Sequence, residues 1–349
     1  MNRTKTVTPV LPTAGRAGSP QPRRRLPGAD HAWASRLLND RNALLLGLIL
    51  LAGFVMSLLS PYFLRVDNLL AMTQYGAVLG LLALGQTLVI LGGGGGIDLS
   101  VGSTMSLSGV VFGLTAVSLG LDPWIAVLVA VVAGVLLGAV NGLLVTVVGV
   151  PPLIATLGTL YLYASAALVL AGGVDINGFD RSGFAQLGQS AIAGIPTQVL
   201  LILLPAYGVL AFVMHRSRFG REVYQVGSNQ LAASLTGVRV ARVRTSLYCI
   251  SGGLAGLASV VMASWLLNAK PTAGTGMELQ AITIAVLGGT AITGGVGRVS
   301  GTFLALTLVV VLNSGLQLAG VSNTWQIGLL GAVLIASILL QHLLGRARR

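Results

Sequence analysis

Ten apolar stretches constrain the fold of this chain more than any other feature of its sequence. None of them contains Asp, Glu, Lys or Arg, and each is close to the ~20 residues that a helix needs to cross a bilayer. Since backbone groups in lipid must be paired within the protein, such stretches form helices. The predicted spans are 43–60, 75–93, 99–119, 124–148, 153–172, 197–214, 245–266, 281–297, 301–320 and 326–344.

We therefore expect an all-α, polytopic integral membrane protein with about ten transmembrane helices. Eight or nine spans with re-entrant segments would also fit the distribution of charge. The composition agrees, because charged residues make up only 9% of the 349 residues, whereas a soluble domain carries roughly a quarter.

The basic residues are arranged for membrane topology. The net charge of +12 could favour nucleic acid, but eight basic residues lie in 1–42, six in 216–244 and three in the last four positions. Clusters next to membrane spans are typical of cytoplasmic loops. We therefore expect contact with membrane lipid and no nucleic acid partner.

The same clusters predict the orientation. An even number of predicted spans separates them, so the N-terminus, the 216–244 loop and the C-terminus are all expected in the cytoplasm. Only Arg65, Arg181 and Lys270 would then lie outside.

Three regions follow from this layout. They are a disordered basic cytoplasmic tail at 1–42, a transmembrane domain at 43–345 and a short cytoplasmic tail at 346–349. No apolar stretch follows the arginines at 23–25 promptly, so we do not expect a cleaved signal peptide.

The sequence also excludes several classes of protein. Ion-coupled carriers and charge-ringed channels generally keep ionisable groups within their spans. The chain contains no phosphate-binding loop of the form G-x-x-x-x-G-K-[ST]. It has one cysteine, Cys249, and no catalytic or metal-ligating constellation. We expect no enzyme activity, cofactor or metal; if the protein pumps, another chain must supply the ATP.

The first motif is GGIDLSVGS at 95–103. Asp98 is a good N-cap for a helix that begins near Leu99, because its carboxylate can meet free amides at the positive helix end. Alternatively, the segment is a broken-helix element beside a translocation path. A second glycine-rich run at 294–297 resembles it, either by chance or as part of an internal repeat of the kind found in transporters.

The second motif lies in the 216–244 loop. It comprises Arg218, Gly220 and Arg221, followed by Asn229, Ala232, Ala233 and Gly237. Ser228 or Asn229 can cap a short helix that has Leu231 and Leu235 on its apolar side and ends at Gly237. Small alanines would let this helix dock on another protein, or the helix could lie along the bilayer interface.

Taken together, the motifs resemble those of the permease subunits of ribose-type ATP-binding cassette (ABC) sugar importers. In order along the chain, they are GGIDLSVGS at 95–103, VPPLIATLGTL at 150–160, RSRFGR with AA-x3-G at 216–237, ELQAI at 278–282 and GGT-x3-GGVG at 288–297. Permeases for branched-chain amino acids are related and share a similar arginine-AA-x3-G loop. The GIDLSVGS segment favours the sugar group.

The resemblance implies a subunit of the bacterial inner membrane that pairs with a second permease copy, the same chain or a sister. Two cytoplasmic ATPase subunits would dock on the 228–237 helices, and a periplasmic or lipid-anchored binding protein would deliver the sugar. The path should be polar and uncharged. Asp98, Asn141, Thr156 and Asn313 are candidates to line it, although the last three could equally bond neighbouring helices.

Three alternatives stay open at this point. They are a branched-chain amino-acid ABC permease, an ATP-independent carrier or facilitator, and a membrane scaffold that transports nothing. The sequence does not identify the sugar, because the binding protein, another chain, sets most of the specificity.

Overall fold

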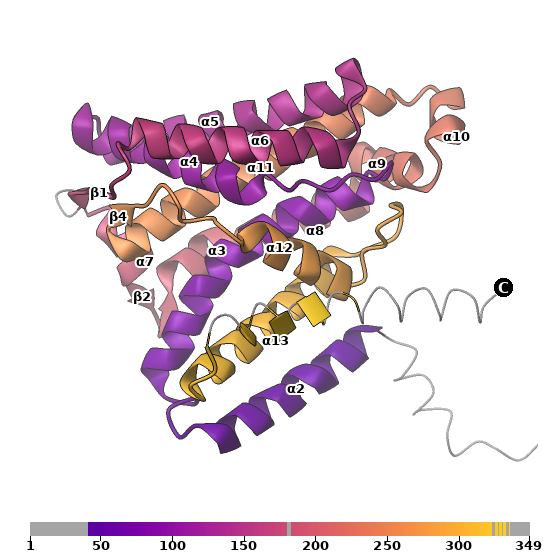
Figure 1. The fold of residues 1–349 in the computed structure, drawn as a ribbon. Helices are drawn as coiled ribbons and strands as arrows, with labels where there is room; N and C mark the ends of the chain where they lie inside the picture. Colours follow the sequence, from indigo (N-terminus) through magenta and orange to yellow (C-terminus); the bar gives the residue numbers. More distant parts are fainter. Residues whose placement is uncertain are drawn as a thin grey trace, which may run out of the picture.

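The computed structural model describes residues 41–179, 183–322 and, beyond these, only 325, 326, 328, 329, 331, 332 and 335. The predicted N-terminal tail and most of the predicted span at 326–344 therefore lie outside the described residues. Figure 1 shows long helices running roughly side by side, with short helices and strands at their ends.

Eight helices in the described part are long and apolar enough to cross a membrane. Three of them include a π-helical segment, η2, η3 or η5. The eight are α2 (Arg41–Leu59), α3 (Val66–Leu91), α4 (Val101–Gly113) with η2 (Leu114–Ser118), α5 (Pro123–Leu143) with η3 (Leu144–Val148), α6 (Pro152–Leu170), η5 (Val199–Leu203) with α8 (Leu204–Arg216), α11 (Val240–Leu266) and α13 (Val299–Leu318).

The predicted span at 281–297 is shorter than expected. Helix α12 (Met277–Leu287) has 11 residues, well below the ~20 that a full crossing requires. Gly288 and Gly289 follow it, and the φ of +102° at Gly289 is left-handed backbone that ends a helix. The chain then runs in turns to Val299, so this part is a half-length helix followed by a non-helical segment.

Two-residue strands and the shortest helix, α7 (Ala185–Gln189), occupy one end of the molecule. Strand β1 (Ile176–Asn177) pairs antiparallel with β4 (Asn268–Ala269), and β2 (Ala191–Ile192) pairs antiparallel with β3 (Ile195–Pro196). The opposite end carries α9 (Arg218–Ser228) and α10 (Gln230–Leu235), as Figure 1 shows.

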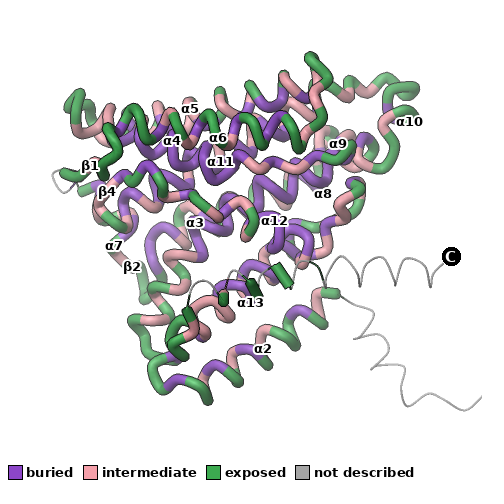
Figure 2. The backbone as a smooth tube through the Cα atoms, in the orientation of Figure 1, coloured by how far each residue is buried: buried purple, intermediate pink, exposed green. Residues whose placement is uncertain are grey.

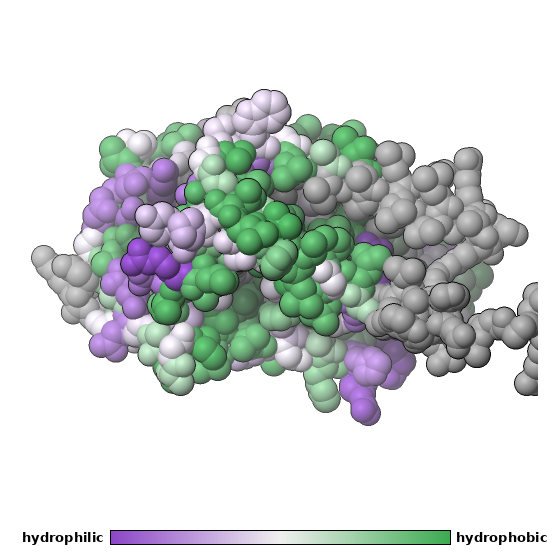
Figure 3. Space-filling model, turned by 90° about the horizontal axis from the view of Figure 1, so that it is seen from below, coloured by the Kyte–Doolittle hydropathy of each residue, from purple (hydrophilic) through white to green (hydrophobic). Residues whose placement is uncertain are grey.

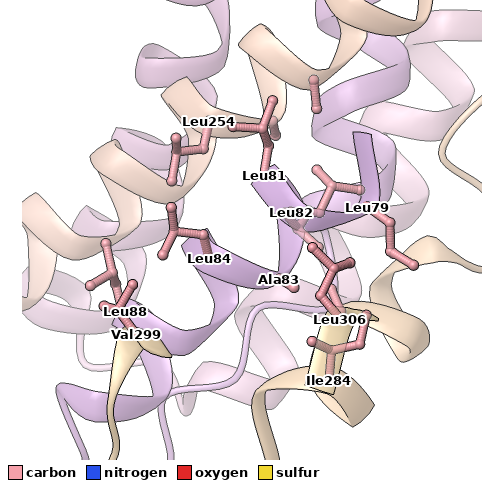
Figure 4. Close-up of a cluster of buried hydrophobic side chains, with 14 of the residues drawn as sticks. Leu79, Leu81, Leu82, Ala83, Leu84, Leu88, Leu254, Ile284, Val299 and Leu306 are labelled. Atoms are coloured by element: carbon pink, nitrogen blue, oxygen red, sulfur yellow. The ribbon is translucent and has the colours of Figure 1, made fainter. Parts of the chain in front are cut away.

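Helix α3 forms the centre of the packing. Every residue from Gly76 to Leu91 is buried, and Figure 2 shows buried backbone concentrated in α3 and the helices next to it. In Figure 4, leucines of α3 meet Leu254 of α11, Ile284 of α12 and Leu306 of α13. A helix that is apolar all round is stable only when neighbours or lipid cover it, and here neighbours cover α3.

Glycines allow α5 and α11 to pack backbone against backbone. A Cβ at Gly134 would lie 2.2 Å from the oxygen of Gly252, and one at Gly138 would lie 2.2 Å from the oxygen of Tyr248. Real Cβ atoms essentially never approach within 3.0 Å, so no larger residue fits. This spacing of four residues is the small-residue packing that membrane helices use.

The outer helices expose apolar side chains. Helix α2 leaves Leu50, Phe54 and Leu58 more than half exposed. Figure 3, which views the side that carries α2, shows hydrophobic residues over most of the middle of this face and hydrophilic residues toward its left end and at its lower right. A broad apolar surface of this kind requires lipid or another membrane protein to cover it.

Candidate translocation cavity and coupling surface

Asp98 lies in a buried hydrogen-bonded network between segments. Its side chain is 2% exposed, and its Oδ1 accepts hydrogen bonds from the Ser100 amide (2.9 Å) and the Ser100 hydroxyl (2.7 Å). Asn141 Nδ2 on α5 donates to Ser100 Oγ (2.7 Å), and Thr159 Oγ1 on α6 donates to Asn141 Oδ1 (2.7 Å). The network thus connects the 92–100 segment to two helices.

The structure corrects the expectation that Asp98 is the N-cap. Helix α4 begins at Val101, and Ser100 occupies the cap position without a side-chain cap hydrogen bond. Asp98 lies two residues before that position, and its carboxylate closes a turn onto the Ser100 amide. Such turns are a common alternative to capping for Asp.

Two further contacts fix the 92–100 segment against the helices. Thr156 Oγ1 donates to the carbonyl of Ile97 (3.1 Å). The Gln86 side chain of α3 pairs with the backbone of Asp98, its nitrogen 3.1 Å from the Asp98 oxygen and its oxygen 3.2 Å from the Asp98 nitrogen. Three of the four candidate path residues therefore meet in one place, where Asp98, Asn141 and Thr156 bond neighbouring segments.

The fourth candidate, Asn313, lies elsewhere, in a cavity of about 550 Å³. This cavity lies between α3, α12 and α13, and Trp265 near the end of α11 contributes to its wall. The described residues that line it are Asn68, Ala71, Met72, Tyr75, Trp265, Gln280, Val310, Asn313, Ser314, Gln317, Val321 and Gln326. None of these side chains is acidic or basic.

The polar groups of the cavity are partly paired with one another. Tyr75 Oη and Gln280 Oε1 are 3.0 Å apart, with the hydroxyl donating. Ser314 Oγ donates to Asn68 Oδ1 (2.9 Å). Amides, hydroxyls and an indole converge here on a volume typical of small-molecule sites, roughly 300–1,000 Å³.

Of these lining residues, the sequence predicts only Asn313. Asn313 and Gln317 are four residues apart on α13, a spacing that places two side chains on one helix face. This spacing is a pattern in the sequence that could have added Gln317 to the predicted residues. Tyr75 and Gln280 carry no comparable signal, because they are 205 positions apart and only packing brings them together.

A second hollow, of about 680 Å³, lies between α5 and α11. Its wall includes the apolar side chains of Leu143, Val147 and Ile250 together with Cys249 and Arg242. It lacks the convergent amides of the first cavity.

The 216–244 loop folds into two helices with defined caps. Ser217 caps α9 by accepting from the Gly220 amide (3.0 Å). Asn229, one of the two caps that the sequence allows, caps α10 by accepting from the Ala232 amide (3.0 Å). The φ of +86° at Gly237 places this residue in the left-handed region that follows a helix end, again as predicted.

The other candidate residues of α9 have local roles. Arg218 forms an ion pair with Glu222 (3.1 Å) one turn away. A Cβ at Gly220 would lie 2.3 Å from the carbonyl oxygen of Met214, so this glycine lets α9 fold back on the end of α8. The guanidinium of Arg221 makes a long contact (3.5 Å) with the carbonyl of Arg216.

Helix α10 presents an uncovered apolar face. Leu231 and Leu235 are 71% and 80% exposed, and Ala232 is exposed beside them. Ala233 is instead 4% exposed and packs into the chain itself. The exposed apolar surface of α10 is therefore formed by Leu231, Ala232 and Leu235.

The fold and the site define a class: a multi-pass helical membrane subunit with an uncharged polar cavity and an exposed helix at its arginine-rich end. The family described as branched-chain amino acid transport system / permease component matches residues 68–338, and this chain belongs to that family. It is thus a transport subunit of the bacterial inner membrane and not itself an enzyme.

Curated relatives point to the sugar branch. The chain is 40% identical to the ribose import permease protein RbsC of Bacillus subtilis, over 85% of this chain and 91% of that protein. It is 36% identical to the autoinducer 2 import system permease protein LsrD of Klebsiella pneumoniae, over 88% and 90%. It is 35% identical to the D-allose transport system permease protein AlsC of Escherichia coli, over 82% and 87%. No solved structure matches.

These matches confirm the resemblance drawn from the motifs. Permease subunits of ABC importers work with ATPase subunits and substrate-binding proteins.

Proposed function

We propose that this chain is the permease subunit of an ABC importer for a monosaccharide or a related neutral polyhydroxy compound, and that the 550 Å³ cavity is part of its path. The observation that carries the proposal is the chemistry of the lining. Tyr75, Gln280, Asn313 and Gln317 offer donors and acceptors without charge, and a polyhydroxy compound presents many hydroxyls and no charge.

The same lining argues against a branched-chain amino acid as the cargo. A zwitterionic amino acid carries an ammonium and a carboxylate, and desolvating either without a partner is costly. The described lining residues supply no acidic or basic side chain to pair with them. The three relatives named for ribose, autoinducer 2 and D-allose add support from sequence.

The partners belong to the proposal as well. An ATPase subunit would dock on the face formed by Leu231, Ala232 and Leu235, and the arginines of the 216–244 loop would surround that contact. A binding protein would deliver the sugar at the opposite end. A second permease copy, identical or related, would cover part of the exposed apolar surface.

The test is substrate uptake by the assembled transporter. The complex is purified from native membranes in mild detergent, its subunits are identified by mass spectrometry, and it is reconstituted into liposomes. Uptake of labelled ribose, allose and leucine is measured with and without internal ATP. We expect ATP-dependent uptake of a sugar; uptake of leucine alone, or uptake that needs no ATP, would contradict the proposal.

Variants of the cavity sharpen this test. Tyr75→Phe removes one hydroxyl and Gln280→Met removes the amide at similar size. Each loses about 1 kcal/mol or more of hydrogen bonding, so we expect roughly five- to tenfold weaker uptake. Tyr161→Phe on α6, whose side chain is 68% exposed, is the matched control and should transport normally.

A further inference from the structure

Three segments meet at the end of the molecule that carries α9 and α10. They are the glycine run after α3, the glycine run before α13, and the end of α9. The Gly295 amide donates to the carbonyl of Leu91 (3.0 Å), and Tyr224 Oη donates to the carbonyl of Gly297 (3.0 Å). Both glycine-rich motifs thus touch each other and the 216–244 loop.

Most of the closest approaches in this contact are between backbone atoms. A Cβ at Gly227 would lie 2.0 Å from the Leu91 oxygen and 2.4 Å from the Gly295 nitrogen. A Cβ at Gly294 would lie 2.3 Å from Gly93 Cα, and one at Gly295 would lie 2.4 Å from Ser228 Oγ. We call the four residues Gly93, Gly227, Gly294 and Gly295 the glycine junction.

Gly227 differs from the other three members in one respect. Gly93, Gly294 and Gly295 have φ values of +68°, +91° and +72°, so their backbone conformation already favours glycine. Gly227 lies within helix α9 and is absent from the positive-φ glycines. A helical position prefers alanine to glycine, and the close contact explains why alanine does not fit here.

The junction is linked through the chain to both the docking face and the cavity. Asn229 alone separates α10 from α9, so displacement of α10 acts directly on the end of α9. From the junction, one glycine run leads to the Asp98 network and α4. The other connects α12, which carries Gln280 at the cavity, to α13, which carries Asn313. Packed backbone has no side chain to absorb a shift, and protein interiors transmit strain.

We propose that Gly227 is a positioning residue that couples ATPase movement to the cavity through the glycine junction. The proposal rests on the proposed function, since it assumes an ATPase partner. It assigns the coupling to the direct contact of α9 with both broken segments, in addition to the docking of α10. Tyr224 supports the same contact through its hydrogen bond to Gly297.

Gly227→Ala tests the contact, and Gly208→Ala is its matched control. Both glycines are helical, but a Cβ at Gly208 would meet nothing within 4 Å. We expect Gly227→Ala to retain the ATPase subunit and ATP hydrolysis within twofold, while sugar uptake per ATP falls at least tenfold. Gly208→Ala should match the unaltered chain in both. A defect of assembly alone would lower hydrolysis and uptake together and would contradict the proposal.

A second measurement does not depend on transport. Amide hydrogen exchange at Gly295, whose N–H donates to Leu91, should be at least tenfold faster in Gly227→Ala and unchanged in Gly208→Ala. If Gly227→Ala does not fold, Tyr224→Phe takes its place, since it removes the bond to Gly297 without adding volume. Normal amide exchange at Gly295 and normal uptake per ATP in the folded variants would overturn the proposed coupling role of the glycine junction. Absence of ATP-dependent uptake in the unaltered complex would instead reject the proposed function.

Discussion

Asp98 is the only acidic or basic side chain buried in the described part of the chain. An unpaired buried charge costs several kcal/mol, and the structure offsets this with two hydrogen bonds from Ser100 and a chain of amides and hydroxyls behind it. From the sequence, Asp98 lay outside every predicted span. Its burial results from the 92–100 segment running back alongside Gln86 of α3.

At the residue scale, we predict that Asp98→Asn is tolerated and Asp98→Ala is not. The Asn side-chain oxygen can accept the same two bonds from Ser100, whereas Ala leaves the Ser100 amide without its partner, at a cost of about 1–3 kcal/mol. Thermal unfolding of the purified protein in detergent measures the difference. Ser103→Ala is the control, because that hydroxyl bonds only the carbonyl of Ser100. If Asn destabilised as much as Ala, the negative charge itself would be required.

At the scale of elements, α10 and α12 contrast in how well their sequences predict them. The cap of α10 depends on Asn229 and its end on Gly237. Each of these residues acts on backbone groups within about one turn of its own position. The length of α12 was overestimated because the residues after Leu287 are apolar as well as glycine-rich. A prediction from hydropathy alone extends the span beyond Leu287, whereas the backbone turns out of the helix at Gly289.

We predict that changing Leu231 and Leu235 together to Glu prevents the ATPase subunit from co-purifying. Both side chains are mostly exposed, so the charges should leave the fold intact while removing the apolar contact. Gln186→Glu, an exposed position near the other end, controls for added negative charge. Acids at Ala233 would be a poorer test, because that side chain is buried within the chain. Normal recovery of the ATPase with the double variant would show that the docking surface does not include this face of α10.

At the scale of the whole molecule, charged side chains lie toward its two ends, with the six arginines of the 216–244 loop at one end and Lys270 at the other. Helix α3 begins after Arg65 and ends at Leu91, which contacts the loop that carries the six arginines. Its 26 residues span about 39 Å as a helix, enough to separate the two ends across a bilayer. Lys270 follows β4 at the end opposite to α10.

We predict that the end with α9 and α10 faces the cytoplasm. Cys249 is the only cysteine, so Cys249→Ser gives a background without thiols. A cysteine introduced at Asp175 should react with a membrane-impermeant maleimide in intact spheroplasts, and one at Ser234 should react only after permeabilisation. Both positions are exposed. The reverse labelling pattern would show that the end with α9 and α10 faces outward. The Cys249→Ser background alone should not react with the maleimide.

Local patterns in the sequence determined the class of fold, most of the membrane helices and the cap and end of the short helix in the 216–244 loop. These features depend on hydropathy and on residues within a few positions of one another, such as Asn229 and Ala232. The motifs were sufficient to indicate the family. The echo between the two glycine runs was visible in the sequence, but their contact was not.

Only the tertiary structure decided which polar residues face a cavity and which bond one another. Asn141 and Asn313 are chemically alike and both lie within predicted spans, yet one pairs with Ser100 and Thr159 and the other lines the 550 Å³ cavity. The glycine junction likewise joins three segments that lie far apart in the sequence, at Gly93, Gly227 and Gly294. A helix fixes which of its residues share a face, but the packing of the surrounding helices fixes what that face meets.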